Sequence, residues 1–547
     1  MVLPLDVLKS YPPHDATLDG VFKSRCSVQA HQPLLIIGEG EGELTMTWAD
    51  FGARYERLAR ALANRGVGRG DRVAVVARNS TAHVLALFAL ARLGAVMVPV
   101  NPDFAVREMA YVLSHSDVCA VLVAVDVLST VRSAISQTSI QPWLVLIDAQ
   151  QDELLTLDDM IANAPAIDLP EPPTAEATCV IVYTSGTTGF PKGVMHSQAS
   201  LMAVGEANLG RIHLQADDRV LVVLPFFHVN ALFYSLSAVF AAGAALVIVP
   251  RFSASRFWQV AADTRATVVN IIEAMGIILM SRDRAEYRAD HCLRVVYGVR
   301  NNAAKTFRED FCVPHLFSGF GMTEIPGVTC NPIYQPGKPG SMGVLGSHPD
   351  PQRAWAQCRI VDEHGQDVAD DVVGELWVKT PVVMQGYFRD PEQTAAAFSE
   401  GWLMTGDLVR RDSDGYFFYA ARKKDIIRRR GENIAAAELD MVISAHPSVY
   451  ESAAIAVPSE LGEDDILTAI VIKPGQALSA EEMAEEIADW CRERLAAHKV
   501  PRYIAFLEAL PHTATHKIAK AVLRQDSALR ASAVDLQDKH RSTSKKA

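Results

Sequence analysis

Residues 71–101 read DRVAVVARNSTAHVLALFALARLGAVMVPVN, in which two Val-rich runs flank a stretch rich in Ala and Leu. Short apolar runs of this kind are typical of buried strands, and the stretch between them is typical of a helix. The same alternation continues to about residue 300, with further apolar runs at 119–125, 142–148, 219–225, 244–250 and 266–272. Alternating strands and helices predict α/β units with largely buried parallel sheets.

The pattern changes after about residue 340. Residues 359–380 and 406–425 contain short strand-like runs with His-Gly and Asp-Gly turns, which predict an antiparallel, β-rich subdomain. Farther along, helices are expected around 435–446 and 481–498. We therefore expect an α/β protein with a large N-terminal domain (1–422) of two doubly wound α/β subdomains plus the β-rich subdomain. A small, mobile α+β domain (423–527) and a disordered tail (528–547) follow.

The composition of the 547-residue chain is that of a globular protein, with 49% hydrophobic and 21% charged residues. A net charge of −12 argues against a nucleic-acid partner. The eight cysteines form no C-x-x-C pair, which favours reduced thiols in a cytoplasmic protein. Residues 231–250 are long and uncharged enough for a membrane span, but Gly243 divides them, so we expect a buried helix followed by a strand. Assembly into a homodimer is left open.

The stretch YTSGTTGFPKG (183–193) follows an apolar run and is rich in glycine and hydroxyl groups. Its glycines allow backbone N–H groups to converge on an anion, while Ser185, Thr187 and Thr188 add hydroxyl donors. Lys192 adds a positive charge. The stretch lacks the Gly-Lys-Ser/Thr ending of a nucleotide-hydrolase P-loop. A polar surface loop is the plainer explanation, but this order of residues after a buried strand favours phosphate binding.

The loop resembles the ATP-phosphate loop of the adenylate-forming superfamily, which includes acyl-CoA synthetases, peptide-synthetase adenylation domains and beetle luciferases. Four more stretches resemble that family's motifs, in the family's order: GFGMTE (319–324), TGDLV (405–409), ARKKDIIRRRGENIAAAELD (421–440) and LPHTATHKIAK (510–520). The similarity extends from about residue 30 to 525. RFSASRFW (251–258) and residues 429–440 look most like the branch of crotonobetaine/carnitine–CoA ligases and fatty-acid–CoA ligases.

The resemblance implies a two-step reaction with ATP, Mg²⁺ and coenzyme A. ATP and a small carboxylic acid give an acyl-adenylate and pyrophosphate, and a thiol then displaces AMP. The residues expected to contact ATP or CoA are Thr184, Ser185, Gly186, Thr187, Thr188, Lys192, Gly298, Phe320, Gly321, Met322, Thr323, Asp407, Arg422, Lys424, Gly431 and Glu432.

Within this set the resemblance gives particular roles. Glu324 would bind magnesium, because a hard carboxylate suits that ion, and Thr323 would bond the α-phosphate. Phe320 stands where the family usually has an adenine-stacking Tyr. Asp407 would accept hydrogen bonds from the ribose hydroxyls, with Arg422 beside it.

Lys517 is the expected catalytic residue of adenylation, because a lysine on a mobile domain can neutralise charge between the carboxylate and the α-phosphate. The family usually has Gly before this lysine; here it is His516, and Lys520 is a weaker candidate. The small domain would rotate about Lys424, and Gly431 would leave room for the thiol arm. The catalytic set expected is Lys517, Thr188, Glu324 and His228.

The acid pocket is expected around the aromatic-rich segment LVVLPFFHVNALF (221–233). His228 would gate the acyl tunnel or approach the carboxylate; a packed histidine is the alternative. Glu273 would suit a cationic or polar acid. The residues expected near the acyl group are His228, Asn230, Phe233, Glu273, Met275, Tyr297, Gly298, Met322 and Ile325.

The leading hypothesis is therefore an ATP-dependent carboxylic acid–CoA ligase. Two alternatives stay open: an enzyme that loads a carrier-protein thiol, and a non-catalytic homologue that binds acyl-adenylate or CoA. A luciferase-like oxygenase is a further alternative. Dependence of AMP release on CoA, on a carrier or on neither would distinguish them.

Overall fold

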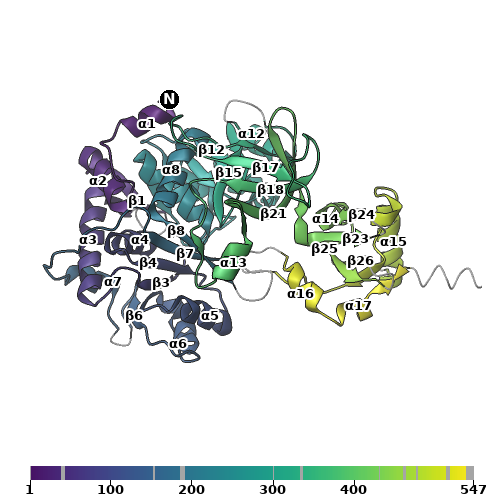
Figure 1. Cartoon of the computed structure of the whole chain (residues 1–547), viewed down its shortest axis with the longest axis horizontal. Coiled ribbons are helices and arrows are strands. Elements are labelled where there is room, and N and C mark those ends of the chain that lie inside the picture. Colours follow the sequence, from purple (N-terminus) through teal and green to yellow (C-terminus); the bar gives the residue numbers. More distant parts are fainter. Residues whose placement is uncertain are drawn as a thin grey trace, which may run out of the picture.

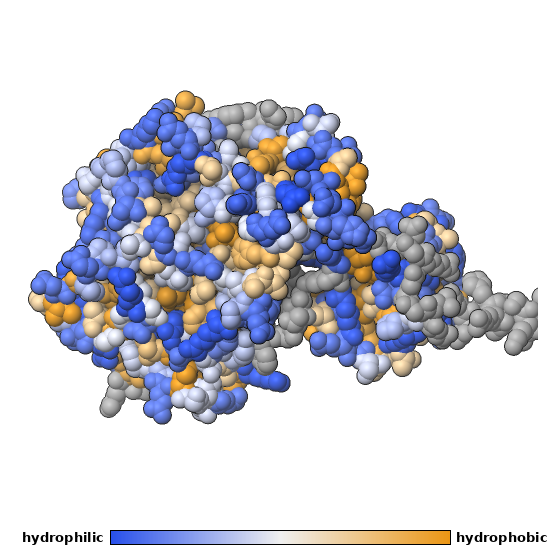
Figure 2. Space-filling view, in the orientation of Figure 1, coloured by the Kyte–Doolittle hydropathy of each residue, from blue (hydrophilic) through white to orange (hydrophobic). Residues whose placement is uncertain are grey.

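The computed structural model describes residues 2–38, 44–151, 154–184, 191–299, 301–332, 337–429, 432–459, 464–475, 478–512 and 518–536; of residues 301, 302, 424, 432 and 433 it describes only the backbone. Figure 1 shows a large body, coloured purple to green, and a small body at the right, coloured green to yellow. Figure 2 shows that the two bodies are joined over a limited area on this face. The predicted α/β class, with a large and a smaller domain, is confirmed.

The first α/β unit contains a seven-stranded sheet in the order β19-β8-β7-β4-β3-β5-β6. Its helix α4 (Thr81–Leu93) connects the two strands predicted within residues 71–101 and is almost wholly buried. The strands are β3 (Arg72–Val76), β4 (Val96–Val100), β5 (Ala120–Val123), β6 (Trp143–Leu146), β7 (Thr178–Thr184), β8 (Lys192–Ser197) and β19 (Gly386–Tyr387). Its other helices are α5 (Val106–Ser116), α6 (Leu128–Ile135) and α7 (Leu157–Ala162).

The second α/β unit contains another seven-stranded sheet, in the order β13-β12-β11-β9-β10-β1-β2. Its strands are β1 (Pro33–Ile37), β2 (Leu44–Thr47), β9 (Arg219–Val222), β10 (Ala245–Ile248), β11 (Val268–Asn270), β12 (Val295–Tyr297) and β13 (His315–Phe317). Its helices are α1 (Pro4–Lys9), α2 (Leu18–Gln29), α3 (Trp48–Asn64), α8 (Gln198–Ile212), α9 (Ser237–Ala242), α10 (Phe257–Asp263), α11 (Glu273–Ser281) and α12 (Asn301–Glu309).

One hydrophobic core joins the two units, because residues of both sheets and of α2, α3, α4, α8 and α9 belong to the same buried cluster. The rings of Phe88 in α4 and Phe240 in α9 lie 4.3 Å apart at their centroids. Residues 231–250 form the end of a π-helix (η2, Asn230–Leu236), then α9 and the buried strand β10, as predicted. Among the described helices, none combines the length and apolar character that a membrane crossing requires.

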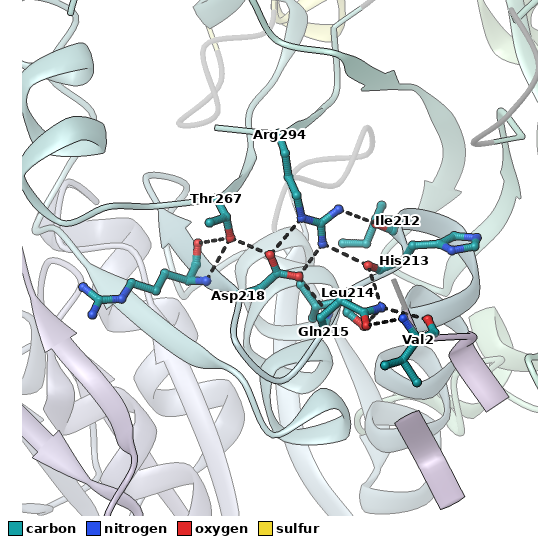
Figure 3. Close-up of polar contacts among 9 residues, drawn as sticks. Val2, Ile212, His213, Leu214, Gln215, Asp218, Thr267 and Arg294 are labelled. Carbon is teal, nitrogen blue, oxygen red and sulfur yellow. Dashed lines mark hydrogen bonds and ion pairs between the residues drawn. The ribbon is translucent and has the colours of Figure 1, made fainter. Parts of the chain in front are cut away.

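An ion pair between partly exposed Arg294 and buried Asp218 helps hold together the amino-terminal ends of three parallel strands of the second sheet (Figure 3). Asp218, Thr267 and Arg294 directly precede β9, β11 and β12, respectively. Thr267 Oγ1 donates to Asp218 Oδ1 over 2.7 Å, and Arg294 Nε donates to the same oxygen over 2.9 Å. Because ligands of open α/β sheets bind at the opposite, carboxyl ends of the strands, this network is structural.

The β-rich subdomain is an eight-stranded sheet whose strands pair antiparallel, as predicted. Its strands are β14 (Gly319–Met322), β15 (Ile325–Cys330), β16 (Ser341–Leu345), β17 (Gln357–Val361), β18 (Gly374–Lys379), β20 (Phe398–Ser399), β21 (Trp402–Arg411) and β22 (Tyr416–Arg422). Helix α13 (Pro391–Ala396) precedes β20.

The small domain combines the hairpin β23 (Ile426–Arg429) and β24 (Glu432–Ala435) with a four-stranded sheet, β25-β26-β27-β28. The sheet contains β25 (Val449–Pro458), β26 (Asp464–Ile472), β27 (Tyr503–Phe506) and β28 (Val534–Asp535). The predicted helices are present as α14 (Ala436–Ser444) and α15 (Ala480–Arg492); α16 (Lys520–Gln525) and α17 (Leu529–Ser532) follow.

The predicted disordered tail (528–547) was wrong for residues 528–536. These residues form α17 and β28, and β28 pairs with β27. Leu536 is buried, and Asp535 forms an ion pair with Arg502 over 3.0 Å. The prediction failed because the polar residues at the end of the sequence gave no sign of the edge strand β28. Residues 537–547 lie outside the described residues.

Candidate active site

The predicted phosphate loop connects two paired strands of the first sheet. Thr184 ends β7 and lies opposite Lys192, the first residue of β8. The loop residues predicted to bind phosphate, Ser185, Gly186, Thr187 and Thr188, lie outside the described residues. Lys192 Nζ lies 4.7 Å from the centroid of the Tyr387 ring, and a cavity of about 170 Å³ adjoins both residues. Lys192 therefore lies at the loop end of the hairpin, directly after the predicted phosphate loop.

Glu324 lies in the turn between β14 and β15 and is 9% exposed, so it is not a solvated loop acid. The hydroxyl of Tyr387 donates to Glu324 Oε1 over 2.8 Å. Burial, and then the charge of Glu324, raise the pKa of Tyr387, which keeps its hydroxyl protonated. Tyr387 thus contacts both Lys192 and Glu324, from motifs more than 100 residues apart in the chain.

Asp407 and Arg422 lie opposite each other on β21 and β22. Arg422 Nε lies 2.7 Å from Asp407 Oδ1, and Arg422 Nη1 donates to the carbonyl of Thr405 over 3.2 Å. Asp407 is 1% exposed. The charge of Arg422 also lowers the pKa of Tyr387, against the larger effect of burial, so Arg422 acts on the group that contacts Glu324. Of the predicted residues, Lys192 and Glu324 therefore meet at Tyr387, and Asp407 and Arg422 form a second pair on β21 and β22.

Several residues predicted to bind adenine or the acyl group come after the carboxyl ends of strands of the second sheet. Gly298 comes directly after β12 with φ of +102°, and a Cβ there would lie 1.9 Å from the carbonyl of Ile271, so only glycine fits. Phe320 and Met322 of β14 are partly buried against the β-rich core. A Cβ on Gly321 would lie 2.4 Å from the Tyr234 hydroxyl, so the β14–β15 hairpin closely covers the π-helix.

The remaining residues of the predicted acid pocket fall into two groups. His228 and Asn230 are partly exposed at the start of the π-helix, and Glu273 and Met275 are partly exposed at the start of α11. Tyr297 packs near Tyr234, with ring centroids 5.8 Å apart. By contrast, two residues of the set are fully buried in the cores: Phe233 and Ile325. Their role in a pocket stays a prediction.

In the small domain, the predicted catalytic lysine, Lys517, and Gly431 lie outside the described residues, and of Lys424 and Glu432 only the backbone is described. The alternative candidate, Lys520, forms an ion pair with Asp440 of α14. Arg429 of β23 is buried, and its Nε lies 3.0 Å from Asp465 Oδ1. Both interactions lie within the small domain and give these two cations structural partners.

The connection between the domains is a short 3₁₀ turn, Lys423–Asp425. Lys423 Nζ lies 2.9 Å from Glu375 Oε2 of the large domain. Asp425 Oδ1 lies 2.5 Å from Arg524 Nη2 of the small domain. The two neighbours of Lys424 are thus attached to different domains.

The sequence-based prediction of this site did not include three residues: His196, Glu375 and Tyr387. Glu375 Oε1 accepts a hydrogen bond from the backbone N–H of Gly406, next to Asp407, over 3.2 Å. An acid within the apolar run VVGELWV was a usable signal, because a charge on a buried strand needs a partner. Tyr387 and His196 carried no comparable signal, since tyrosine and histidine are common in ordinary cores.

Comparisons with known proteins agree with this arrangement. A family model described as AMP-binding enzyme matches residues 22–388, and one described as AMP-binding enzyme C-terminal domain matches residues 438–517. A crotonobetaine/carnitine–CoA ligase of Escherichia coli O17:K52:H18 is 28% identical over 519 residues, which cover 91% of this chain and 96% of that ligase.

Two solved structures have the same fold. An anthranilate CoA ligase in complex with anthranoyl-AMP has a TM-score of 0.81 and 24% identity, covering 96% of this chain and 99% of that one. A Mycobacterium tuberculosis fatty acyl CoA synthetase has a TM-score of 0.72 and 26% identity, covering 94% and 98%. Since the first family model alone spans more than half of the sequence, the chain belongs to the AMP-binding enzyme family.

Proposed function

We propose that the protein is an ATP-dependent carboxylic acid–CoA ligase. It would form an acyl-adenylate with release of pyrophosphate, then a CoA thioester with release of AMP. Two observations carry this proposal: Tyr387 contacts both Lys192 and Glu324, and Asp407 pairs with Arg422, so residues of four separate family motifs are brought into two contacts. The names of the relatives, which are CoA ligases and a CoA synthetase, support it.

In the first step, a carboxylate oxygen of the acid attacks the α-phosphorus of ATP, and the bond to the departing pyrophosphate breaks. Lys192 and the hydroxyl-rich loop would neutralise the charge that moves onto pyrophosphate. Asp407 would accept hydrogen bonds from the ribose hydroxyls, and Phe320 would stack on adenine. Lys517 would approach the α-phosphate when the small domain closes.

The carboxylate of Glu324 suits a magnesium ion, and we include Mg²⁺ in the proposed function. Mg²⁺ is usually held by one or two carboxylates together with substrate phosphates. Glu324 supplies one buried carboxylate, whose Oε1 is held by Tyr387, so its orientation is fixed. A bound Mg²⁺ would supply charge neutralisation at the phosphates.

In the second step, the CoA sulfur attacks the acyl carbonyl carbon, and AMP leaves. We place the pivot between these steps at Lys424, because Lys423 is tied to the large domain and Asp425 to the small one. Gly431 would leave space for the thiol arm, and Glu432 would lie beside it. Homodimerisation and a cytoplasmic location stay predictions from the sequence.

The test is AMP release from ATP and Mg²⁺ across a panel of carboxylic acids, with and without CoA. The panel includes betaine-like, short, medium, long and aromatic acids, because Glu273 suits a cationic acid and one relative is a carnitine–CoA ligase. We expect CoA-dependent release with one class of acid. Release that requires a carrier protein, or no release with ATP still bound, would contradict the proposal in favour of the two alternatives.

A further inference from the structure

His196 is a fully buried histidine of β8 that contacts three separate elements. Its Nε2 lies 2.7 Å from the carbonyl oxygen of Thr323, and its Nδ1 lies 3.0 Å from Ser200 Oγ of α8. Its ring lies 4.8 Å from the Phe233 ring of the π-helix, at 63°. One side chain therefore connects the phosphate-loop hairpin with the β14–β15 turn and with the predicted acyl side.

These partners determine the protonation of the imidazole. A carbonyl oxygen can only accept, so Nε2 carries the proton and donates to Thr323. Nδ1 is then the acceptor, and the hydroxyl of Ser200 donates to it. Burial lowers the pKa of His196 to about 4, so the neutral form is present at neutral pH. Ser200 thus selects the tautomer that Thr323 requires.

Three contacts hold the segment that contains Glu324. His196 holds the carbonyl of Thr323, which belongs to the peptide group joining Thr323 to Glu324. The backbone N–H of Met384 donates to the carbonyl of Glu324 over 2.8 Å. Tyr387 holds the carboxylate. Of these three, only the contact from His196 comes from β8, the strand that begins with Lys192.

We propose that His196 is a positioning residue for the nucleotide site, which holds the Thr323–Glu324 peptide at a fixed place relative to Lys192. This inference rests on the proposed function, because it assumes that Lys192 and Glu324 act on the same ATP. Loss of the hydrogen bond lets the turn shift, and displacements near 1 Å can cost about 100-fold in rate.

The variants separate this role from ordinary packing. His196→Leu fills a similar volume but cannot donate to Thr323. His196→Gln can place an amide N–H near the position of Nε2 and should restore the bond. Ser200→Ala keeps the imidazole but removes the donor that selects its tautomer. His83→Leu is the matched control, because His83 is also buried (1% exposed) and stacks on Phe226, with no contact to Thr323.

The first readout is calorimetric binding of ATP to the full-length protein without acid, with Mg²⁺ and with EDTA. For wild type we expect tighter binding with Mg²⁺. His196→Leu should lose about tenfold in affinity for MgATP, and less in EDTA, because a lost hydrogen bond and a displaced Glu324 together amount to roughly that factor. His196→Gln should return to within about threefold of wild type, and Ser200→Ala should lose about threefold.

The second readout is acid-dependent exchange of pyrophosphate into ATP, with circular dichroism to establish folding. We expect His196→Leu to lower kcat, whereas His83→Leu lowers only the melting temperature. Wild-type MgATP affinity in folded His196→Leu, equal losses in both leucine variants, or no rescue by glutamine would overturn the inference. If His196→Leu does not fold, the MgATP affinities of His196→Gln and Ser200→Ala test the inference in its place. A wild-type protein without exchange for any acid would instead overturn the proposed function.

Discussion

The acids of the candidate site in the large domain are neutralised differently from the acids of the small domain. In the large domain, Glu324 accepts a hydrogen bond from the Tyr387 hydroxyl. Asp407 pairs with Arg422, whose side chain is 35% exposed. In the small domain, Asp465 lies between Arg429 and Arg502, both largely buried, and Asp440 is matched by Lys520. When cations of its own domain neutralise an acid, the charge of that acid needs no ligand to balance it. Glu324 and Asp407 are paired in a way that leaves a role for ATP and Mg²⁺.

The largest effect that follows from this difference concerns the two lysines of residues 510–520. Lys517→Ala should reduce acyl-adenylate formation by at least about 100-fold, the usual cost of removing a group that stabilises developing charge. Pyrophosphate exchange measures this step. Thioester formation from supplied acyl-adenylate should be largely spared, because the second step does not involve that charge.

Lys520→Ala is the control for this prediction. Its removal leaves Asp440 without its cation in a partly buried place, which should lower the free energy of unfolding by about 1–2 kcal/mol but leave adenylation near normal. Thermal unfolding and exchange measured together distinguish the two variants. Near-normal adenylation by Lys517→Ala, with loss in Lys520→Ala, would transfer the catalytic role to Lys520.

The sequence predicted the fold better than the pairing of charges. Alternating apolar runs predicted the α/β units, because burial in parallel sheets requires continuous apolar strands. Resemblance identified Glu324 and Asp407, but not Tyr387, which donates to Glu324, or Glu375, which accepts from Gly406 beside Asp407. Both are distant in sequence and are brought close only by the fold. The prediction of a disordered tail was wrong at 528–536, because a two-residue edge strand has too few side chains to form a recognisable pattern.

An intermediate effect is expected for Asp407. Asp407→Asn removes the charge that matches Arg422 and weakens acceptance from the ribose hydroxyls, so KM for ATP should rise by about 10- to 100-fold. Comparison of ATP with 2′-deoxy-ATP tests the assigned contact directly. Wild type should favour ATP, and the preference should shrink in the variant. An unchanged preference would remove Asp407 from the ribose site and leave it only a structural ion pair.

The smallest effect is expected at the two ion pairs that flank Lys424. Glu375→Gln removes the partner of Lys423 but keeps an oxygen that can accept from Gly406, and Asp425→Asn removes the partner of Arg524. Lys423 is largely exposed, so Glu375→Gln should cost less than about 1 kcal/mol in stability, whereas Asp425→Asn, at a partly buried pair, should cost about 1 kcal/mol.

If the small domain pivots at Lys424, both ion pairs persist in both steps, because each one lies within one moving body. The ratio of adenylation rate to thioester-formation rate should therefore change by less than about twofold in either variant, since a pair that persists in both steps affects both rates alike. Single-turnover measurements of the two steps give this ratio. A clear shift in Glu375→Gln alone would mean that the Lys423 pair breaks during rotation, and would place the pivot on the large-domain side of Lys423. A shift in Asp425→Asn alone would place it beyond Asp425.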